Sequence, residues 1–159
     1  MTTVNLAGKS FYSGMNSEFL KKIRSYSGYL VLRFNKEQTM PERILKIGEM
    51  VPRKGSTSME LIFKTLNHEI HLWRVIPGEW VYPHIHPHND DIWYFIQGVG
   101  EYYTAAQEKK TVKPGDIAVA SPGDVHGIFN SGSEDIIVYS VLSPLPVEIY
   151  EAPGFEYPE

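Results

Sequence analysis

The chain has 159 residues, a formal net charge of −4 and no cysteine. This length suits one domain with a sizeable core, and the lack of cysteine excludes disulfides, thiolate nucleophiles and sulfur-rich zinc sites. Because the chain has no basic run longer than two residues, no apolar run of about 18 residues and no secretion signal at its start, we expect a cytoplasmic protein that binds neither nucleic acid nor a membrane.

Residues 1–50 predict an extension of the main domain. The segment 16–26, "NSEFLKKIRSY", starts with an Asn-Ser capping signal and spaces its apolar residues along one face of a short helix. The segments 28–34 and 42–51 predict strands. Since neither is long enough to form a domain, we expect the extension to cover the main domain or to pair with a second copy in a homodimer.

Residues 51–159 predict an all-β domain. From about residue 58 the apolar residues alternate with a period of two, and Gly, Pro, Asn or Asp clusters interrupt them about every eight to twelve residues. This spacing is typical of short antiparallel strands in a sandwich or a small barrel. The expected strands are 58–65, 69–76, 80–86, 91–97, 101–105, 110–112, 116–121, 126–130 and 135–142.

Three histidines and an aspartate stand near the starts and ends of these strands. Alternate side chains of a strand share a face, so His84 and His86 are expected to point the same way, together with Tyr82. Asp91 opens the next strand, and His126 opens a later one. Two imidazoles separated by one residue can bind one metal ion.

The residues from Gly78 to Gly98 form a spaced motif. Gly78 is followed by five residues, His84, one residue, His86, four residues, Asp91, six residues and Gly98. The fixed positions of this motif are thus two glycines at its ends and, between them, three polar residues that can bind a metal. The intervening letters are those of two apolar strands and the loop "PHND".

A second motif runs from Gly115 to Asn130. Six residues separate Gly115 from the pair Pro122-Gly123, His126 follows after two more, and Asn130 after another three. Together the two motifs resemble the signature motifs of the cupin superfamily, in the form of a small single-domain metal-binding cupin. The resemblance covers about a third of the chain.

The resemblance implies an antiparallel jelly-roll β-barrel that holds one divalent metal ion. The ligands it carries over are His84, His86, Asp91 and His126. Cupins usually have Glu where this chain has Asp91, and Asp reaches about 1.5 Å less far. Either the strand shifts inward, a water molecule bridges the gap, or Asp91 leaves the metal and acts as a free base. Imidazole and carboxylate ligands suit Fe, Mn, Ni, Co or Zn and do not choose among them.

Aromatic and charged residues near the motifs supply further candidates. Tyr82 is a candidate for moving a proton, and Trp93 and Phe95 would line a substrate cavity or simply fill a small barrel. Arg74 would bind a substrate carboxylate or phosphate if it faced the interior, although its place in the alternation favours the solvent face.

Four more polar residues are expected to stay outside the site. Each of them lies in or beside a turn, where a solvated or packed side chain is the simpler account. They are His68, His71, His88 and Asp90.

These features predict a divalent-metal-dependent enzyme acting on a small polar metabolite that chelates the metal. Four protein ligands leave positions open on a six-coordinate ion, as in catalytic sites. Among cupins, dioxygenases and sugar isomerases share this kind of site. An aromatic cavity and few cations for a phosphate favour the dioxygenase. The alternatives are a metal-dependent isomerase or lyase of a sugar or carboxylate, and a non-catalytic ligand-binding cupin.

Overall fold

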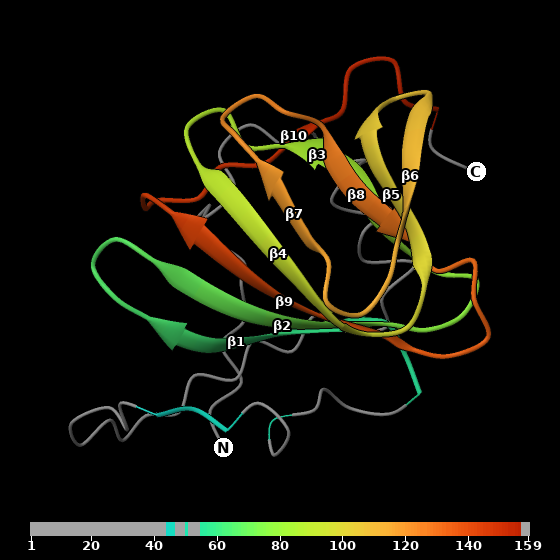
Figure 1. Ribbon diagram of the computed structural model, residues 1–159. Helices are drawn as coiled ribbons and strands as arrows, with labels where there is room; N and C mark the ends of the chain where they lie inside the picture. Colours follow the sequence, from blue (N-terminus) through green and yellow to red (C-terminus); the bar gives the residue numbers. More distant parts are fainter. Residues whose placement is uncertain (1–43, 47–49, 51–54, 157–159) are drawn as a thin grey trace.

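The computed structural model describes residues 44–46, 50 and 55–156 (Figure 1). Every regular element in these residues is a strand, and no helix that could cross a membrane is found in the same part of the chain. The strands are β1 (Ser58–Lys64), β2 (Glu69–Val75), β3 (Trp80–Ile85), β4 (Asp90–Gln97), β5 (Gly100–Ala105), β6 (Glu108–Val112), β7 (Ile117–Ala120), β8 (His126–Phe129), β9 (Ile136–Ser143) and β10 (Tyr150–Glu151).

Two five-stranded sheets form the molecule, and neighbouring strands in both are antiparallel. One sheet has the order β1-β2-β9-β4-β7 and the other β10-β3-β8-β5-β6. Figure 1 shows the first sheet running from green β1 and β2 to orange β7, with β3, β5, β6 and β8 behind and beside it. The all-β jelly roll is confirmed. Within the described residues, however, no strand pairing joins the two sheets into one continuous barrel.

The core lies between the two sheets. In β4 the buried residues Asp91, Trp93 and Phe95 are at most 2% exposed, whereas the three apolar residues between and after them are 37–44% exposed. This alternation is what a strand with one buried face predicts. The buried cluster between the sheets consists of Val75, Val81, Trp93, Phe95, Tyr102, Val112, Ile128, Ile136 and Val138.

Two similar turns set the ends of the strands around β7. Gly115 and Gly123 have φ angles of 94° and 88°, which suit glycine far better than other residues. In each turn the carboxylate of the following aspartate accepts a hydrogen bond of 2.9 Å from a backbone N–H three residues earlier, at Lys113 and at Ser121. The second turn leads directly into β8.

The predicted strands agree with the structure at nearly every position. The nine predicted ranges correspond to β1 through β9, with ends that differ by at most two residues. Strand β10, only two residues long, was not expected; it pairs with β3 at Ile85 and His84. The expected helix 16–26 and strand 28–34 lie outside the described residues, as does most of 42–51.

Candidate metal centre

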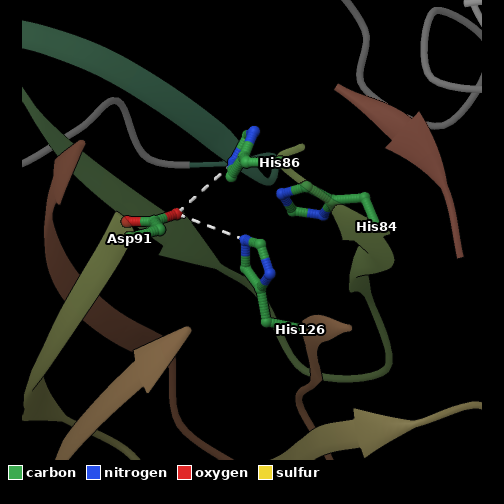
Figure 2. Close-up of side chains that lie close together, drawn as sticks. All are labelled: His84, His86, Asp91 and His126. Atoms are coloured by element: carbon green, nitrogen blue, oxygen red, sulfur yellow. Dashed lines mark ion pairs between the residues drawn. The ribbon is translucent and has the colours of Figure 1, made fainter. Parts of the chain in front are cut away.

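The three histidines and the aspartate converge at one end of the two sheets. His84 lies in β3, and His86 directly follows the end of that strand. Asp91 lies in β4, and His126 is the first residue of β8. One candidate ligand atom from each residue lies within 4.8 Å of those of the other three, and all four residues are buried. Figure 2 shows the four side chains pointing toward one another.

The distances within this cluster suit a shared ion. Oδ2 of Asp91 lies 3.4 Å from Nε2 of His126 and 3.7 Å from Nε2 of His86. The ring centroids of His84 and His126 are 4.2 Å apart, and the ring centroid of His86 lies 5.0 Å from each of them. Ligand atoms held about 2.1 Å from one ion lie roughly 3 to 4 Å from each other. Only a small contraction would bring the four to bonding distance.

Each imidazole is oriented by a backbone carbonyl. A carbonyl can only accept a hydrogen bond, so Nδ1 of each ring must carry the proton and Nε2 is left with its lone pair. Nε2 is the atom that points to the centre of the cluster for His86 and His126. The bonds run from Nδ1 of His84 to the Tyr82 carbonyl at 2.8 Å, from His86 to Glu148 at 2.6 Å and from His126 to Asp124 at 3.0 Å.

The protonation states also favour a cation. Burial lowers the pKa of His84 well below its usual value, and the nearby His126 and His86 lower it further, so its ring is neutral at neutral pH. Burial raises the pKa of Asp91, but the adjacent imidazoles of His126 and His86 outweigh it and hold the pKa well below the usual range. A neutral imidazole and an ionised carboxylate are the forms that bind metal.

Two atoms of the cluster lack any partner of their own. Nε2 of His126 and Oδ1 of Asp91 are fully buried and make no hydrogen bond. Leaving such groups unpaired is costly, and a bound cation would satisfy both. The imidazole and carboxylate donors therefore fit Fe, Mn, Ni, Co or Zn.

Tyr82 does not belong to this group, and the expectation that it shares a face with His84 is wrong. Val81 pairs with Ile128 and His84 with His126, so β3 carries one residue more than β8 over this interval. Such a bulge reverses the alternation that sequence spacing predicts. Val81 packs in the core, while the ring of Tyr82 stacks on that of Trp80 with centroids 5.7 Å apart.

The other proposed cavity residues have separate places. Trp93 and Phe95 lie on the same inner face as Asp91 and belong to the core cluster, and the ring of Trp93 meets that of His126 edge-on at 6.0 Å. Arg74 lies on the opposite face of β2 from the inward-facing Val75 and forms an ion pair with Asp135. It is 8% exposed, so it faces neither the interior nor open solvent.

The four residues expected to stay outside the cluster do so. His68, His88 and Asp90 are exposed. His71 is buried, with a relative exposure of 7%, and its Nε2 lies 3.3 Å from Oε2 of Glu69.

Asn89 is a positioning residue that the sequence argument overlooked. It is 1% exposed, its Nδ2 donates to the carbonyl of Pro146 at 3.1 Å, and its Oδ1 accepts from the N–H of Glu148 at 3.4 Å. The carbonyl of Glu148 in turn accepts from His86. A polar residue inside the loop between two motif positions was the only sequence signal. Its partners lie more than fifty residues away.

Comparison with known proteins places the chain in a family. The cupin domain model matches residues 71–142. A crystal structure from Klebsiella pneumoniae, described as an uncharacterized conserved protein with a double-stranded β-helix domain, is 35% identical. It is matched over 70% of this chain and 98% of its own, with a TM-score of 0.65.

Two more distant proteins are also similar. Gentisate 1,2-dioxygenase from Ralstonia sp is 27% identical over 124 residues, which are 71% of this chain and 34% of that protein, so the chain spans about a third of the length of this curated relative. A predicted oxalate decarboxylase from Thermotoga maritima is 24% identical, over 58% of this chain and 84% of its own, with a TM-score of 0.53, a likeness of fold alone. With both spaced motifs, the two antiparallel sheets and these relatives, the chain belongs to the cupin superfamily.

Proposed function

We propose that this chain is a metal-dependent enzyme in which His84, His86, Asp91 and His126 hold one divalent ion. The observation that carries the proposal is the convergence of ligand atoms from four buried residues within 4.8 Å, with two buried polar atoms of His126 and Asp91 left unpaired. When bound, the ion would supply a site of positive charge at which a substrate oxygen is polarised and dioxygen can bind beside it.

The arrangement of the three histidines suits binding of a metal ion and not proton transfer. Each Nδ1–H is committed to a backbone carbonyl, so the ring cannot turn and Nε2 stays directed inward. Asp91 has its pKa well below the usual range, which makes it a poor proton acceptor at neutral pH. These properties favour Asp91 as a ligand over Asp91 as a free base.

The reaction that we propose is oxygenation of a hydroxylated aromatic acid. Support comes from the similarity to gentisate 1,2-dioxygenase over 71% of this chain and from the aromatic side chains of Trp93 and Phe95, which lie on the same inner face as Asp91. A substrate carboxylate and an adjacent hydroxyl suit an ion that has free positions. In a dioxygenase reaction, a carbon–carbon bond of the ring breaks and both atoms of O₂ enter the product, so the substrate supplies all the electrons that O₂ accepts.

Oxygen uptake tests this proposal. Protein loaded with Fe(II) under nitrogen is mixed with gentisate and then with oxygenated buffer. We expect equimolar consumption of O₂ and gentisate, and its loss in the double variant His84→Ala/His126→Ala. His88→Ala, which removes an exposed histidine from the same loop region, is the matched control and should retain uptake. Equal uptake by the double variant, or none by the iron-loaded wild type, would overturn the proposed reaction.

A further inference from the structure

A second polar group lies on the inner face of the β1-β2-β9-β4-β7 sheet, separate from the metal ligands. Trp73 of β2 packs against the core cluster and its ring lies 6.4 Å from that of Trp93. The pairing of β2 with β9 is regular throughout, so His71, two residues earlier, shares the inner face with Trp73. Glu69 shares it as well.

Three residues form one row across this face. His71 of β2 stands directly opposite Ser140 of β9, and Ser140 stands directly opposite Trp93 of β4. Residues opposite each other in an antiparallel pair point to the same side of the sheet. Figure 1 shows β2, β9 and β4 side by side. The row therefore leads from β2 to the strand that carries Asp91.

Two members of the row have a buried polar atom without a partner. Nδ1 of His71 and Oγ of Ser140 make no hydrogen bond, and their residues are 7% and 0% exposed. The N–H of Trp93, by contrast, acts on the Asp91 carboxyl and lowers its pKa. Buried polar side-chain atoms are normally paired, and an unpaired one costs roughly as much as a lost hydrogen bond. Two neighbouring exceptions on one face, directly opposite each other on β2 and β9, point to a ligand group that both can reach.

Glu69 determines what His71 offers to such a group. The Glu69 carboxylate lies 3.3 Å from Nε2 of His71 and 2.5 Å from Nζ of Lys64. His71, with smaller contributions from Lys64, lowers the pKa of Glu69 to about 2 against the opposing effect of burial. An ionised carboxylate only accepts hydrogen bonds, so a hydrogen bond from His71 to Glu69 places a proton on Nε2 and leaves Nδ1 as the nitrogen that can accept from a ligand.

We propose that His71 and Ser140, with Glu69 orienting His71, bind a hydroxyl group of the substrate at the end remote from the metal. The hydroxyl donates to Nδ1 of His71 and accepts from Oγ of Ser140. This inference rests on the proposed function, because it gives a metal-bound aromatic acid its second point of attachment.

The dimensions of the sheet restrict the substrate to a small one. Strands are spaced about 4.8 Å apart, so the Cα atoms of His71 and Trp93 are separated by about 10 Å, and inward-pointing side chains shorten the gap. Asp91 is two residues from Trp93 along β4. A ligand held at both the metal and this row therefore has to be about the size of a single ring with polar groups at opposite ends.

Binding of two probes to metal-loaded protein tests the inference without turnover. Gentisate (2,5-dihydroxybenzoate) and salicylate (2-hydroxybenzoate) share the carboxylate and adjacent hydroxyl, and only gentisate has the remote hydroxyl. Calorimetric titration under nitrogen should show that the wild type binds gentisate roughly tenfold or more tightly than salicylate. In Ser140→Ala and in His71→Phe the ratio should fall to about one, through weaker binding of gentisate alone.

The controls separate this inference from the proposed function. His68→Ala, which removes an exposed histidine near the same strand, should keep the wild-type ratio. Metal content is measured in each variant and should be unchanged, because neither residue belongs to the metal cluster. If the wild type binds no metal, the proposed function fails. If metal is bound but the wild type binds the two probes equally or binds neither, or if both variants keep the preference, the row is satisfied by water only and the inference is overturned.

Discussion

At the scale of single residues, the orientation of the histidines depends on backbone atoms. The carbonyls of Tyr82, Glu148 and Asp124 each receive one Nδ1–H and so fix the tautomer of a different ring. The motif spacing predicted which residues come together, because their side chains carry the chemistry. It could not predict these partners, since any residue type has a carbonyl.

Replacing Asp91 by Asn should weaken metal binding far more than replacing its neighbour Asp90. Asp91 is buried among the histidines and ionised, whereas Asp90 is exposed. Replacing residues that only support a metal ligand typically weakens metal binding by about tenfold or more, so loss of a charged ligand should reduce the metal affinity at least as much. Competition with a fluorescent chelator measures the affinity of each variant. An equal or larger effect of Asp90→Asn would contradict the assignment of Asp91 as the metal ligand.

Asn89→Ala should weaken the site although Asn89 touches none of the four ligand atoms. Without the side chain, the segment 144–148 loses three hydrogen bonds, at Pro144, Pro146 and Glu148, and the carbonyl that orients His86 is no longer held. We expect about tenfold weaker metal binding and a loss of roughly 1–3 kcal/mol in stability. The same chelator competition and urea unfolding measure both. Unchanged metal affinity in a folded Asn89→Ala protein would show that the carbonyl needs no such support.

At the scale of strands, alternation predicted nearly all of the sheet but missed the bulge in β3. The periodic pattern of β4 is unbroken through Phe95, and the prediction placed Asp91, Trp93 and Phe95 on one face as observed. In β3 the same reasoning placed Tyr82 beside His84, and the inserted residue reversed it. Pro83, which lacks an N–H and interrupts the ladder, is the local signal that could have raised this possibility.

Gly127 is the residue that lets the bulge lie against β8. A Cβ at this position would stand 2.6 Å from the backbone N of Pro83 and 2.8 Å from the carbonyl of Val81, and neither atom can move freely. Gly127→Ala should therefore push β3 away from β8, lower stability by roughly 1–3 kcal/mol and separate His84 from His126 enough to weaken metal binding.

Gly78→Ala is the matched control for this strand contact. Gly78 has a φ of 80° but nothing within 4 Å of an added Cβ, so its cost is backbone strain of roughly 1–2 kcal/mol with no displacement of the site. Urea unfolding of the metal-free proteins and chelator competition compare the two. Wild-type metal affinity in Gly127→Ala would mean that the close approach does not position the histidines.

At the scale of the whole molecule, burying four polar groups ties stability to pH. His84 has a depressed pKa when folded and titrates near 6.5 when unfolded, so the unfolded state binds the extra proton as the pH falls. The stability from its neutral form is present above pH 6.5 and is lost below it. Asp91 and Glu69 have depressed pKa values too, and their contributions last until far more acidic pH.

Metal-free protein should accordingly lose stability between pH 6.5 and 5, by up to about 1.4 kcal/mol per pH unit for each proton taken up on unfolding. Between pH 7 and 8 the effect of His84 should be absent. Urea unfolding at a series of pH values measures this slope, and a His84→Gln variant should show a smaller one. A wild-type stability that is constant or rises from pH 6.5 to 5 would contradict the buried neutral state of His84.

The whole account depends on one ion being held by residues from three strands, and metal stoichiometry tests this most directly. Protein dialysed against each of Fe(II), Mn(II), Ni(II), Co(II) and Zn(II) is analysed for bound metal, alongside His84→Ala/His126→Ala and the His88→Ala control. We predict close to one ion per chain for at least one of these metals in the wild type and the control, and almost none in the double variant. A wild type that retains no divalent metal, or a folded double variant that retains one ion per chain, would contradict the central claim.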